Sequence, residues 1–248
     1  MPEGHLVHRT AREQAADLAG CRVHVSSPQG RLDTEALDGR VLSEVSAHGK
    51  HLLHRFEHGR TVHVHLGMRG LWLRYPDPAP PPREGVRLRL AGRATYDLIA
   101  PTTCEVLTDR GVRELSGRLG PDPLRADSSA GEAVARLRAS AAPVGAALLD
   151  QSVWSGVGNA WRAELLWLAR LDPRTPAAEL SEADVHRLWE LARDFMTMGR
   201  DAGQVVSDAA AGDERWVYKR ERCRSCGAPI RVEQLGGRTS YACPVEQR

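Results

Sequence analysis

The spacing of hydrophobic and polar positions changes once along the chain. Residues 6–19 place apolar groups at helical spacing and predict a helix that Gly20 ends. Between residues 22 and 107, short segments alternate apolar with polar residues or are rich in β-branched ones. Residues 57–60 (EHGR) predict a hairpin turn, and the proline-rich residues 76–85 predict a loop that cannot pair in a sheet. We therefore expect a helix followed by an antiparallel β-sandwich or flattened barrel.

In the second part of the chain, apolar residues recur every three or four positions. The predicted helices are 131–140, 143–150, 160–170 and 181–199. Ser181 followed by Asp184 is typical of a helix N-terminus. A stretch rich in Pro, Gly, Asp and Ser separates the two parts.

Together these patterns predict an α+β fold in four parts. They are a β-sandwich domain at residues 1–118, a linker at 119–130, a helical domain at 131–210 and a cysteine-containing β-hairpin at 211–248.

Composition is compatible with two packed cores in a chain of 248 residues, of which 42% are hydrophobic. No apolar run approaches the roughly 20 residues of a membrane-spanning helix. The first residues are polar and include Glu3, His5 and Arg9, unlike a secretory signal. We expect a protein of the cytosol and nucleoid that does not interact with membranes.

Charge is unevenly distributed, although the net charge is only +2. Residues 215–248 hold eight Arg or Lys and three Glu, a local charge of +5, which leaves −3 on the rest. A basic segment of this kind fits either a polyanion-binding element or an ordinary solvated terminus. Only Lys50 and Lys219 are lysines among 34 basic residues. Coding bias explains most of this imbalance, but an ammonium can lose its proton where arginine cannot, so both are candidates for lysine-specific chemistry.

The cysteines indicate a metal site rather than disulfides. There are five, an odd number, and Cys223, Cys226 and Cys243 lie close together in the sequence. A tetrahedral zinc site requires a fourth ligand, which the repeated spacing places at Glu246. We predict one structural Zn²⁺ completed by Glu246 or water; the alternative is a hairpin held by packing alone.

Two further motifs are consistent with contacts to nucleic acid. Residues 155–159 (SGVGN) form a glycine-rich turn before a predicted helix, where backbone N–H groups and the Asn159 amide could bind phosphate. Met68, in HLGMRG, has the flexible apolar shape of a wedge that enters a base stack, and core packing is its alternative role. Five histidines surround it in the sequence, but alternation distributes them over two faces, which favours structural roles: His51, His54, His58, His63 and His65.

The chain begins MPEG, and the initiator Met1 is commonly removed before proline. Pro2 would then be a free secondary amine with Glu3 beside it. This pair is either a nucleophile with an acid or an ordinary frayed end.

These motifs, in this order, resemble the formamidopyrimidine-DNA glycosylase/endonuclease VIII family. The segments that carry the resemblance are MPEG, GKHLL, HLGMRG, LGPDPL, QSVWSGVGNAWRAELLWLARLDP, CRSC and GGRTSYACP. MPEG is more similar to the endonuclease VIII branch than to the MPELPE of the formamidopyrimidine branch.

The resemblance implies a bifunctional DNA glycosylase/AP lyase of base excision repair. It implies that Pro2 attacks C1′ of a damaged nucleotide to form a Schiff base, and that Glu3 acts as the general acid/base. It also implies that Lys50 serves β-elimination, that Arg238 serves δ-elimination and phosphate binding, and that Asn159 binds phosphate. Met68 is expected to intercalate, and Lys219 to contact the DNA backbone.

The resemblance further implies a catalytic β-sandwich domain, a helix–two-turn–helix domain and a zinc finger. The expected partner is damaged double-stranded or abasic DNA, and we expect a monomer. Oxidised pyrimidines are the expected substrates.

Two departures from the family pattern leave alternatives open. Leu6 replaces a second acid, and Glu246 replaces the fourth cysteine. The alternatives are an 8-oxoguanine/formamidopyrimidine-directed enzyme, a damaged-DNA-binding protein with reduced catalysis, and a zinc-ribbon module for protein interactions.

Overall fold

The computed structural model describes residues 2–210 and 214–248, which form two compact units. The first, here called the sheet unit, comprises Pro2 and Val7–Gly117. The second, the helical unit, comprises Glu3–Leu6 and Arg118–Arg248. Met1, whose removal is predicted, lies outside the described residues.

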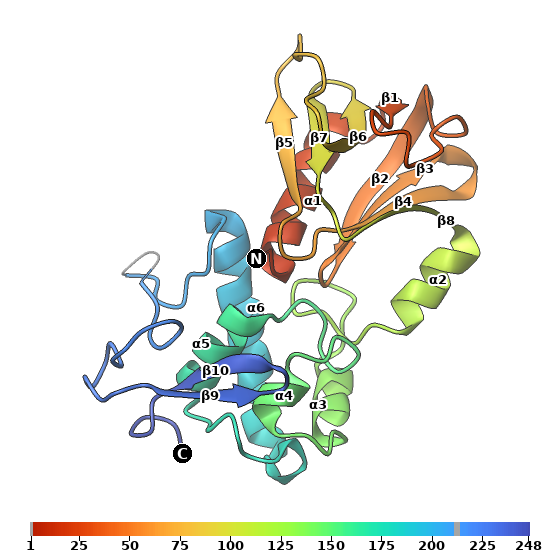
Figure 1. The fold of residues 1–248 in the computed structure, drawn as a ribbon. Helices are drawn as coiled ribbons and strands as arrows, with labels where there is room; N and C mark the ends of the chain where they lie inside the picture. The colour runs from red at the N-terminus through yellow and green to blue at the C-terminus, as the bar shows by residue number, and fades with distance from the viewer. Residues whose placement is uncertain (1, 211–213) are drawn as a thin grey trace. The chain divides into compact units, whose positions relative to one another are not determined.

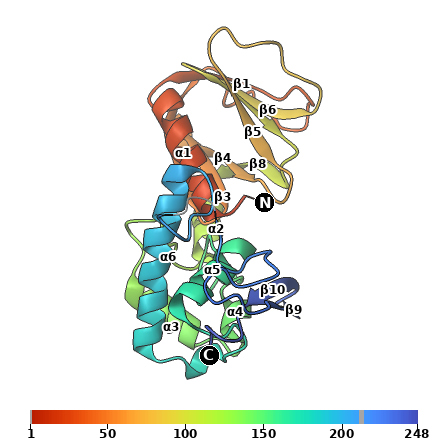
Figure 2. The same cartoon turned by 90° about the vertical axis from the view of Figure 1, so that its left-hand side faces the viewer.

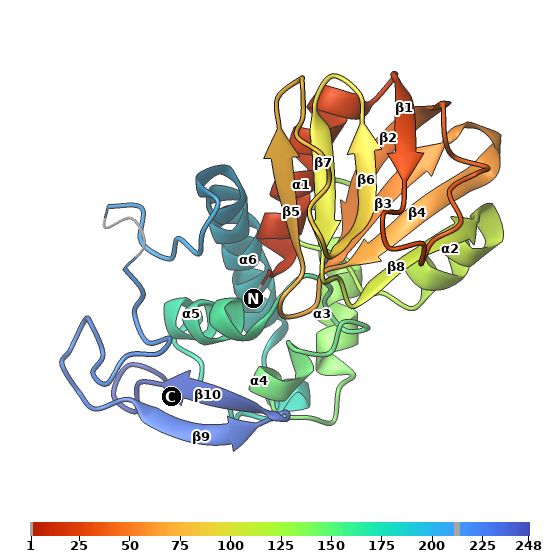
Figure 3. The same cartoon turned by 45° about the horizontal axis from the view of Figure 1, so that its top comes forward.

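The sheet unit contains eight antiparallel strands in the order β5-β7-β6-β1-β2-β3-β4-β8. Their bounds are β1 Arg22–Ser26, β2 Arg40–His48, β3 His51–Phe56, β4 Arg60–His65, β5 Leu71–Tyr75, β6 Val86–Ala91, β7 Thr95–Ile99 and β8 Thr103–Thr108. Strands β1 and β2 pair through only two residue pairs, Arg22 with Val41 and Val23 with Arg40. The sheet therefore consists of two four-stranded halves, which Figure 3 shows one behind the other.

The core of the sheet unit lies between these halves and helix α1 (Gly4–Leu18). Its fully buried side chains include Leu18 of α1, Leu52 and Val62 of one half, and Leu88 and Leu98 of the other. This arrangement confirms the predicted β-sandwich. The short 3₁₀ helix η1 (Glu57–Gly59) forms the predicted turn between β3 and β4, with His58 and Gly59 at positive φ.

The helical unit is built around α5, as Figure 2 shows. Its helices are α3 Ala130–Arg138, α4 Val144–Ala147, α5 Asn159–Ala169, η2 Ala177–Glu179 and α6 Glu182–Ala202. Ser181 caps α6 as predicted, because its hydroxyl accepts a hydrogen bond from the Asp184 backbone N–H at 3.1 Å. Trp154 and Trp189 meet edge to face at 4.9 Å in the core of this unit.

The C-terminal hairpin of the helical unit consists of β9 (Arg231–Leu235) and β10 (Arg238–Ala242), shown in blue in Figure 1. Gly236 and Gly237 form the predicted turn at φ 62° and 70°, a left-handed conformation that glycine adopts without strain. A small apolar cluster packs the cysteine-containing segment against α5 through Trp167, Val217 and Ile230.

The observed mixture of helices and antiparallel sheet confirms the predicted α+β class. One helix, α2 (Asp109–Gly117), is absent from the sequence prediction because Leu115 is its only buried residue and the apolar pattern is correspondingly weak. In the part of the chain that the structure describes, no helix has the length and apolar character required to span a bilayer.

Candidate functional site

Glu3 lies at the N-terminus of helix α5. Its Oε1 accepts a hydrogen bond from the Ala160 backbone N–H at 2.9 Å, and its Oε2 accepts from Gly158 at 3.1 Å and Trp161 at 3.3 Å. A helix N-terminus presents unsatisfied N–H groups and partial positive charge, so a carboxylate is stabilised there. Only 3% of Glu3 is exposed. Three N–H groups at the predicted phosphate site are thus bound to the chain's own carboxylate.

The glycines of SGVGN make room for this contact. A Cβ atom on Gly158 would lie 2.3 Å from the Glu3 Cδ atom, far inside van der Waals contact. Gly4, the residue after Glu3, donates its backbone N–H to the Gly156 carbonyl at 2.9 Å. The glycine-rich turn therefore holds the N-terminal segment, a role that its spacing alone does not reveal.

The residues around Pro2 are firmly held. Pro2 itself is half-buried and immediately precedes Glu3. His5 is buried, and its Nδ1 accepts a hydrogen bond from the Trp161 indole N–H at 2.8 Å. Burial, with a smaller contribution from the charge of Arg215, lowers the pKa of His5 to about 4. His5 is therefore a neutral acceptor at physiological pH, a role that the sequence prediction missed.

Lys50 lies in the tight turn between β2 and β3 of the sheet unit and is half-buried. Burial lowers the pKa of His51 to about 3, and nearby His63, His65 and Lys50 act in the same direction. The pKa of His65 is also lowered by burial and by the charge of Lys50. The Lys50 ammonium is therefore surrounded by neutral imidazoles.

A hydrogen-bonded chain of side chains crosses three strands beside Lys50. The His63 Nδ1 atom lies 2.9 Å from Glu105 Oε1, and the His63 Nε2 atom lies 2.8 Å from His51 Nδ1. His54 points to the opposite face, where its Nε2 lies 2.6 Å from Gln14 Oε1. The histidines therefore occupy both faces, as the alternation predicts.

Met68 is 66% exposed in the turn after β4. Gly67 in this turn has φ 66°, and a Cβ there would lie 1.8 Å from Thr102 Oγ1, so the turn requires glycine. Met68 is therefore not a core residue, and its role as a wedge stays a prediction.

Arg238 is exposed at the start of β10, beside the Gly-Gly turn. Asn159 donates its side-chain N–H to the Thr239 carbonyl at 2.9 Å, and its Oδ1 accepts from Arg162 at 2.5 Å. The Arg162 guanidinium also donates to the Leu235 and Thr239 carbonyls, each at 2.9 Å. The structure therefore brings Asn159 and the Arg238 hairpin together through Arg162, which the sequence prediction missed.

Arg162 is unusual for an arginine because only 1% of it is exposed. Burial lowers its pKa to about 10, so it stays charged at neutral pH. Glu164, on the same helix, is also buried and accepts backbone N–H groups from Trp216, Val217 and Tyr218. These bonds fix the segment that leads to Lys219, which is exposed and has φ 58°.

Three of the four predicted metal ligands converge. The Sγ atoms of Cys223, Cys226 and Cys243 all lie within 4.8 Å of one another, the only such group among the described residues. Backbone N–H groups of Ser225 and Cys226 bond to the Cys223 sulfur, and those of Val245 and Glu246 bond to the Cys243 sulfur. Such bonds stabilise thiolates, the form that binds a metal. The donor set therefore fits three positions of a zinc site.

The structure does not bring the Glu246 carboxylate to the three sulfurs. Its Oε2 is paired with the Arg170 guanidinium, and its Oε1 accepts from the Ser225 hydroxyl at 3.1 Å.

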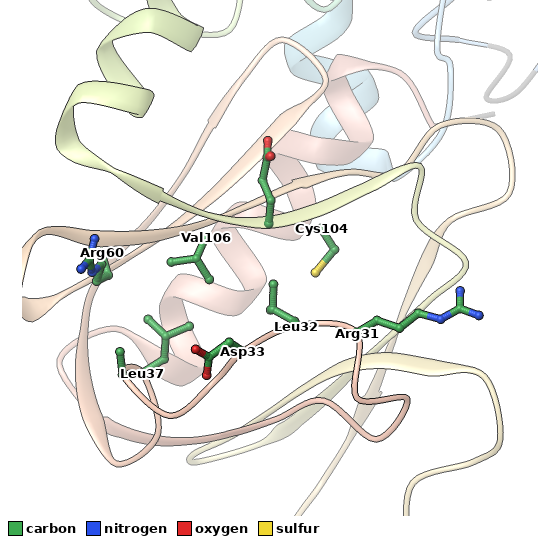
Figure 4. Close-up of a pocket in the computed structure, with 9 residues that line it drawn as sticks. Arg31, Leu32, Asp33, Leu37, Arg60, Cys104 and Val106 are labelled. Atoms are coloured by element: carbon green, nitrogen blue, oxygen red, sulfur yellow. The ribbon is translucent and has the colours of Figure 1, made fainter.

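A separate cavity of about 460 Å³ lies within the sheet unit (Figure 4). Leu32, Cys104 and Val106 line it together with the charged residues Arg31 and Arg60. Burial raises the pKa of the Cys104 thiol to about 11, which keeps it protonated and a poor nucleophile. None of the predicted site residues lines this cavity.

Comparison with known protein families agrees with this arrangement. Residues 1–102 match the formamidopyrimidine-DNA glycosylase N-terminal domain, and residues 119–209 match the formamidopyrimidine-DNA glycosylase H2TH domain.

Individual relatives cover nearly the whole chain. Endonuclease 8 1 of Mycobacterium tuberculosis is 41% identical over 267 residues, with 100% of both chains covered. The DNA-(apurinic or apyrimidinic site) lyase Nei2 of Mycolicibacterium smegmatis is 36% identical, with 100% of this chain and 99% of the relative covered. A crystal structure of Lactococcus lactis Fpg (MutM) with DNA containing N7-benzyl-Fapy-dG superposes with a TM-score of 0.82 at 24% identity over 100% of both chains. This similarity bears out the predicted fold.

Proposed function

Because this chain belongs to the formamidopyrimidine-DNA glycosylase/endonuclease VIII family, we propose that it is a bifunctional DNA glycosylase and AP lyase of base excision repair. The observation that carries the proposal is the position of Glu3, whose buried carboxylate is fixed on α5 directly after Pro2. A nucleophile and a proton-transferring group are thereby held as chain neighbours on a rigid helix end.

In the proposed glycosylase step, the Pro2 amine forms a bond to C1′ of the damaged nucleotide. The N-glycosidic bond breaks, and its electron pair leaves with the base, which takes up a proton. Glu3 delivers a proton to the sugar ring oxygen as the ring opens, and the nitrogen lone pair forms the C1′ iminium. Because Pro2 is a secondary amine, this iminium carries a permanent positive charge.

In the proposed lyase step, the iminium acidifies the C2′ proton. Loss of that proton, followed by cleavage of the C3′–O bond, expels the 3′ phosphate in β-elimination. A second proton loss at C4′ and cleavage of the C5′–O bond expel the other phosphate in δ-elimination. Lys50 serves the first elimination and Arg238 the second, as cations that stabilise the departing phosphates.

The proposed partner is damaged or abasic duplex DNA, bound by a monomer in the bacterial-type cytosol. The damaged nucleotide leaves the base stack, and exposed Met68 fills the gap. Lys219 and the remaining side-chain N–H of Asn159 contact backbone phosphates. The MPEG start favours oxidised pyrimidines as substrates.

The proposed cofactor is one structural Zn²⁺ held by Cys223, Cys226 and Cys243. When bound, the ion ties the two cysteine segments together, and water occupies the fourth position that Glu246 does not supply.

Borohydride trapping tests the proposal. Protein shown by mass spectrometry to lack Met1 is mixed with an abasic duplex and reduced, which converts the Schiff base into a stable crosslink. We expect crosslinking by the wild type and a loss of at least about tenfold in Pro2→Gly, whose primary amine is a poorer electron sink. Binding of damaged duplex without crosslinking or nicking would instead indicate a damaged-DNA-binding protein.

Lesion duplexes test substrate choice. Faster release of 5-hydroxycytosine and thymine glycol than of 8-oxoguanine is the expected result, and the reverse order would favour the formamidopyrimidine-directed alternative.

A further inference from the structure

We propose that Glu246 is not a metal ligand but part of a latch that fixes the finger, here residues 223–248, to helix α5 independently of any metal. The consequence is that Arg238 keeps its position when the three thiols hold no ion. This inference rests on the proposed function only in the role that it gives Arg238.

The first part of the latch joins the chain end to the end of α5. The Glu246 carboxylate pairs with Arg170, the residue that ends α5 in a left-handed conformation. The side chain of Gln247 is buried, accepts the Cys243 backbone N–H at 2.8 Å and donates to the Leu171 carbonyl at 2.8 Å. The Arg248 backbone N–H donates to the Arg170 carbonyl at 3.2 Å. Three consecutive residues of the finger therefore bond to α5 without involving a sulfur atom.

A stack of side chains supports Arg170 from below. Its guanidinium lies 4.3 Å from the centre of the Trp167 ring, and Trp167 stacks on Trp216 at 4.1 Å with 10° between the ring planes. Arg224 covers the other face of Trp216 at 4.6 Å and forms ion pairs with Asp208 and Glu214, each at 2.9 Å. Stacked cations and aromatic rings of this kind attract one another most strongly when they are shielded from water.

The second part of the latch holds the hairpin that carries Arg238. Arg162 donates to the carbonyls of Leu235 and Thr239, which flank the Gly-Gly turn and Arg238 itself. Because Arg162 is buried, water does not compete for these bonds. At the start of β9, Arg231 pairs with Asp172 at 2.7 Å. Helix α5 and the residues after it thus fix both ends of the β9 strand.

The two parts explain why a chain with three thiols can keep a working finger. Both Glu246 oxygens are engaged, one by Arg170 and one by Ser225, so neither is directed at a metal. A finger closed by four thiolates depends on its ion to join the two cysteine segments. Here the segment after Cys243 is joined to α5 by ion pairing and hydrogen bonding instead.

Metal removal from the full-length protein tests the latch. The protein is stripped with a chelator under reducing conditions, and near-ultraviolet circular dichroism follows the Trp167–Trp216 stack while gels follow the β and β,δ products on an abasic duplex. We expect stripped wild type to keep the tryptophan signal and its δ product within about threefold. Stripped Arg170→Met should lose both, with a fall of at least about tenfold in δ product. Arg187→Met, an exposed arginine on α6, is the matched control and should behave as wild type.

Two variants separate the ligand role from the latch role. Glu246→Ala should leave the zinc affinity, measured by competition with a chromophoric chelator, within about threefold of wild type. Arg162→Met should lose the δ product even when metal is present, while borohydride trapping through Pro2 persists.

The proposal is overturned if stripped wild type loses the tryptophan signal, or if Glu246→Ala lowers the zinc affinity by more than about tenfold. It is also overturned if Arg170→Met is no more dependent on metal than Arg187→Met. Failure of all forms to crosslink would reject the proposed function, whereas the dichroism and zinc measurements would still decide the latch.

Discussion

The Glu3 carboxylate and the Ala160 backbone N–H form a 2.9 Å hydrogen bond across 157 positions of the chain. The residue proposed as the general acid/base is therefore also the N-terminal cap of helix α5. Catalysis and folding of the helical unit thus depend on the same side chain, and changes to either partner should affect both.

Gly158→Ala should impair catalysis by displacing Glu3. The added methyl would lie 2.3 Å from Glu3 Cδ, so the carboxylate must move away from the helix end. General acid/base groups contribute factors of about 10²–10⁴, and we expect single-turnover base release to fall at least about 100-fold.

Gly117→Ala is the matched control, because a Cβ there meets no atom within 4 Å. It should leave base release unchanged. Equal rates for Gly158→Ala and wild type would contradict a catalytic role for the position of Glu3.

Glu3→Gln should separate the two roles of this side chain. The amide has one acceptor oxygen and no charge, so it cannot accept all three N–H groups, and we expect the free energy of unfolding to fall by about 1–2 kcal/mol. Base release should be lost, whereas borohydride trapping on a preformed abasic site should persist because Pro2 is intact. Urea unfolding and the two activity assays measure these outcomes, and unchanged base release would reject the acid/base role.

Local features of the fold could be predicted because their causes lie close together in the sequence. The Ser181 cap needs only the N–H of Asp184, and the hairpin turn needs only two glycines that adopt positive φ. The alternating strands likewise need only a consistent buried face, as in β6, where every second residue is buried.

The partners of charged residues on α5 could not be predicted in this way. Arg162 and Glu164 have the sequence pattern of a solvated helix surface, yet both are buried. Arg162 binds carbonyls, and Glu164 binds mainly backbone N–H groups. Any residue type supplies such groups, so no pattern identifies them. The pairing of Arg170 with Glu246 joins positions that only the tertiary fold brings together.

Met68→Ala should reduce activity on duplex DNA without affecting folding. The side chain is 66% exposed, so the free energy of unfolding should change by less than about 0.5 kcal/mol. Extruding a nucleotide from a duplex costs a few kcal/mol, and without a wedge we expect about tenfold slower excision. Activity on a single-stranded abasic oligonucleotide should be unchanged, and Met68→Leu should retain duplex activity. An equal loss on both substrates would contradict the wedge.

Stability should fall as the pH is lowered below 6.5, because His54 is buried in its neutral form. Burial lowers its pKa in the folded protein from 6.5 to about 4. Between these values the unfolded chain binds a proton that the folded chain does not, so protonation favours unfolding. The contribution is absent above pH 6.5 and grows to a slope of about 1.4 kcal/mol per pH unit for one histidine.

His54→Gln isolates this contribution, because glutamine can donate to Gln14 as His54 does but does not titrate in this range. The difference in free energy of unfolding between wild type and variant should therefore shift by about 1 kcal/mol from pH 7.5 to pH 5.5, in favour of the variant. Comparison with the variant is required because buried His5 should add a slope of the same sign in the helical unit. Parallel pH profiles for the two proteins would mean that His54 is protonated in the fold, with a rearranged contact to Gln14.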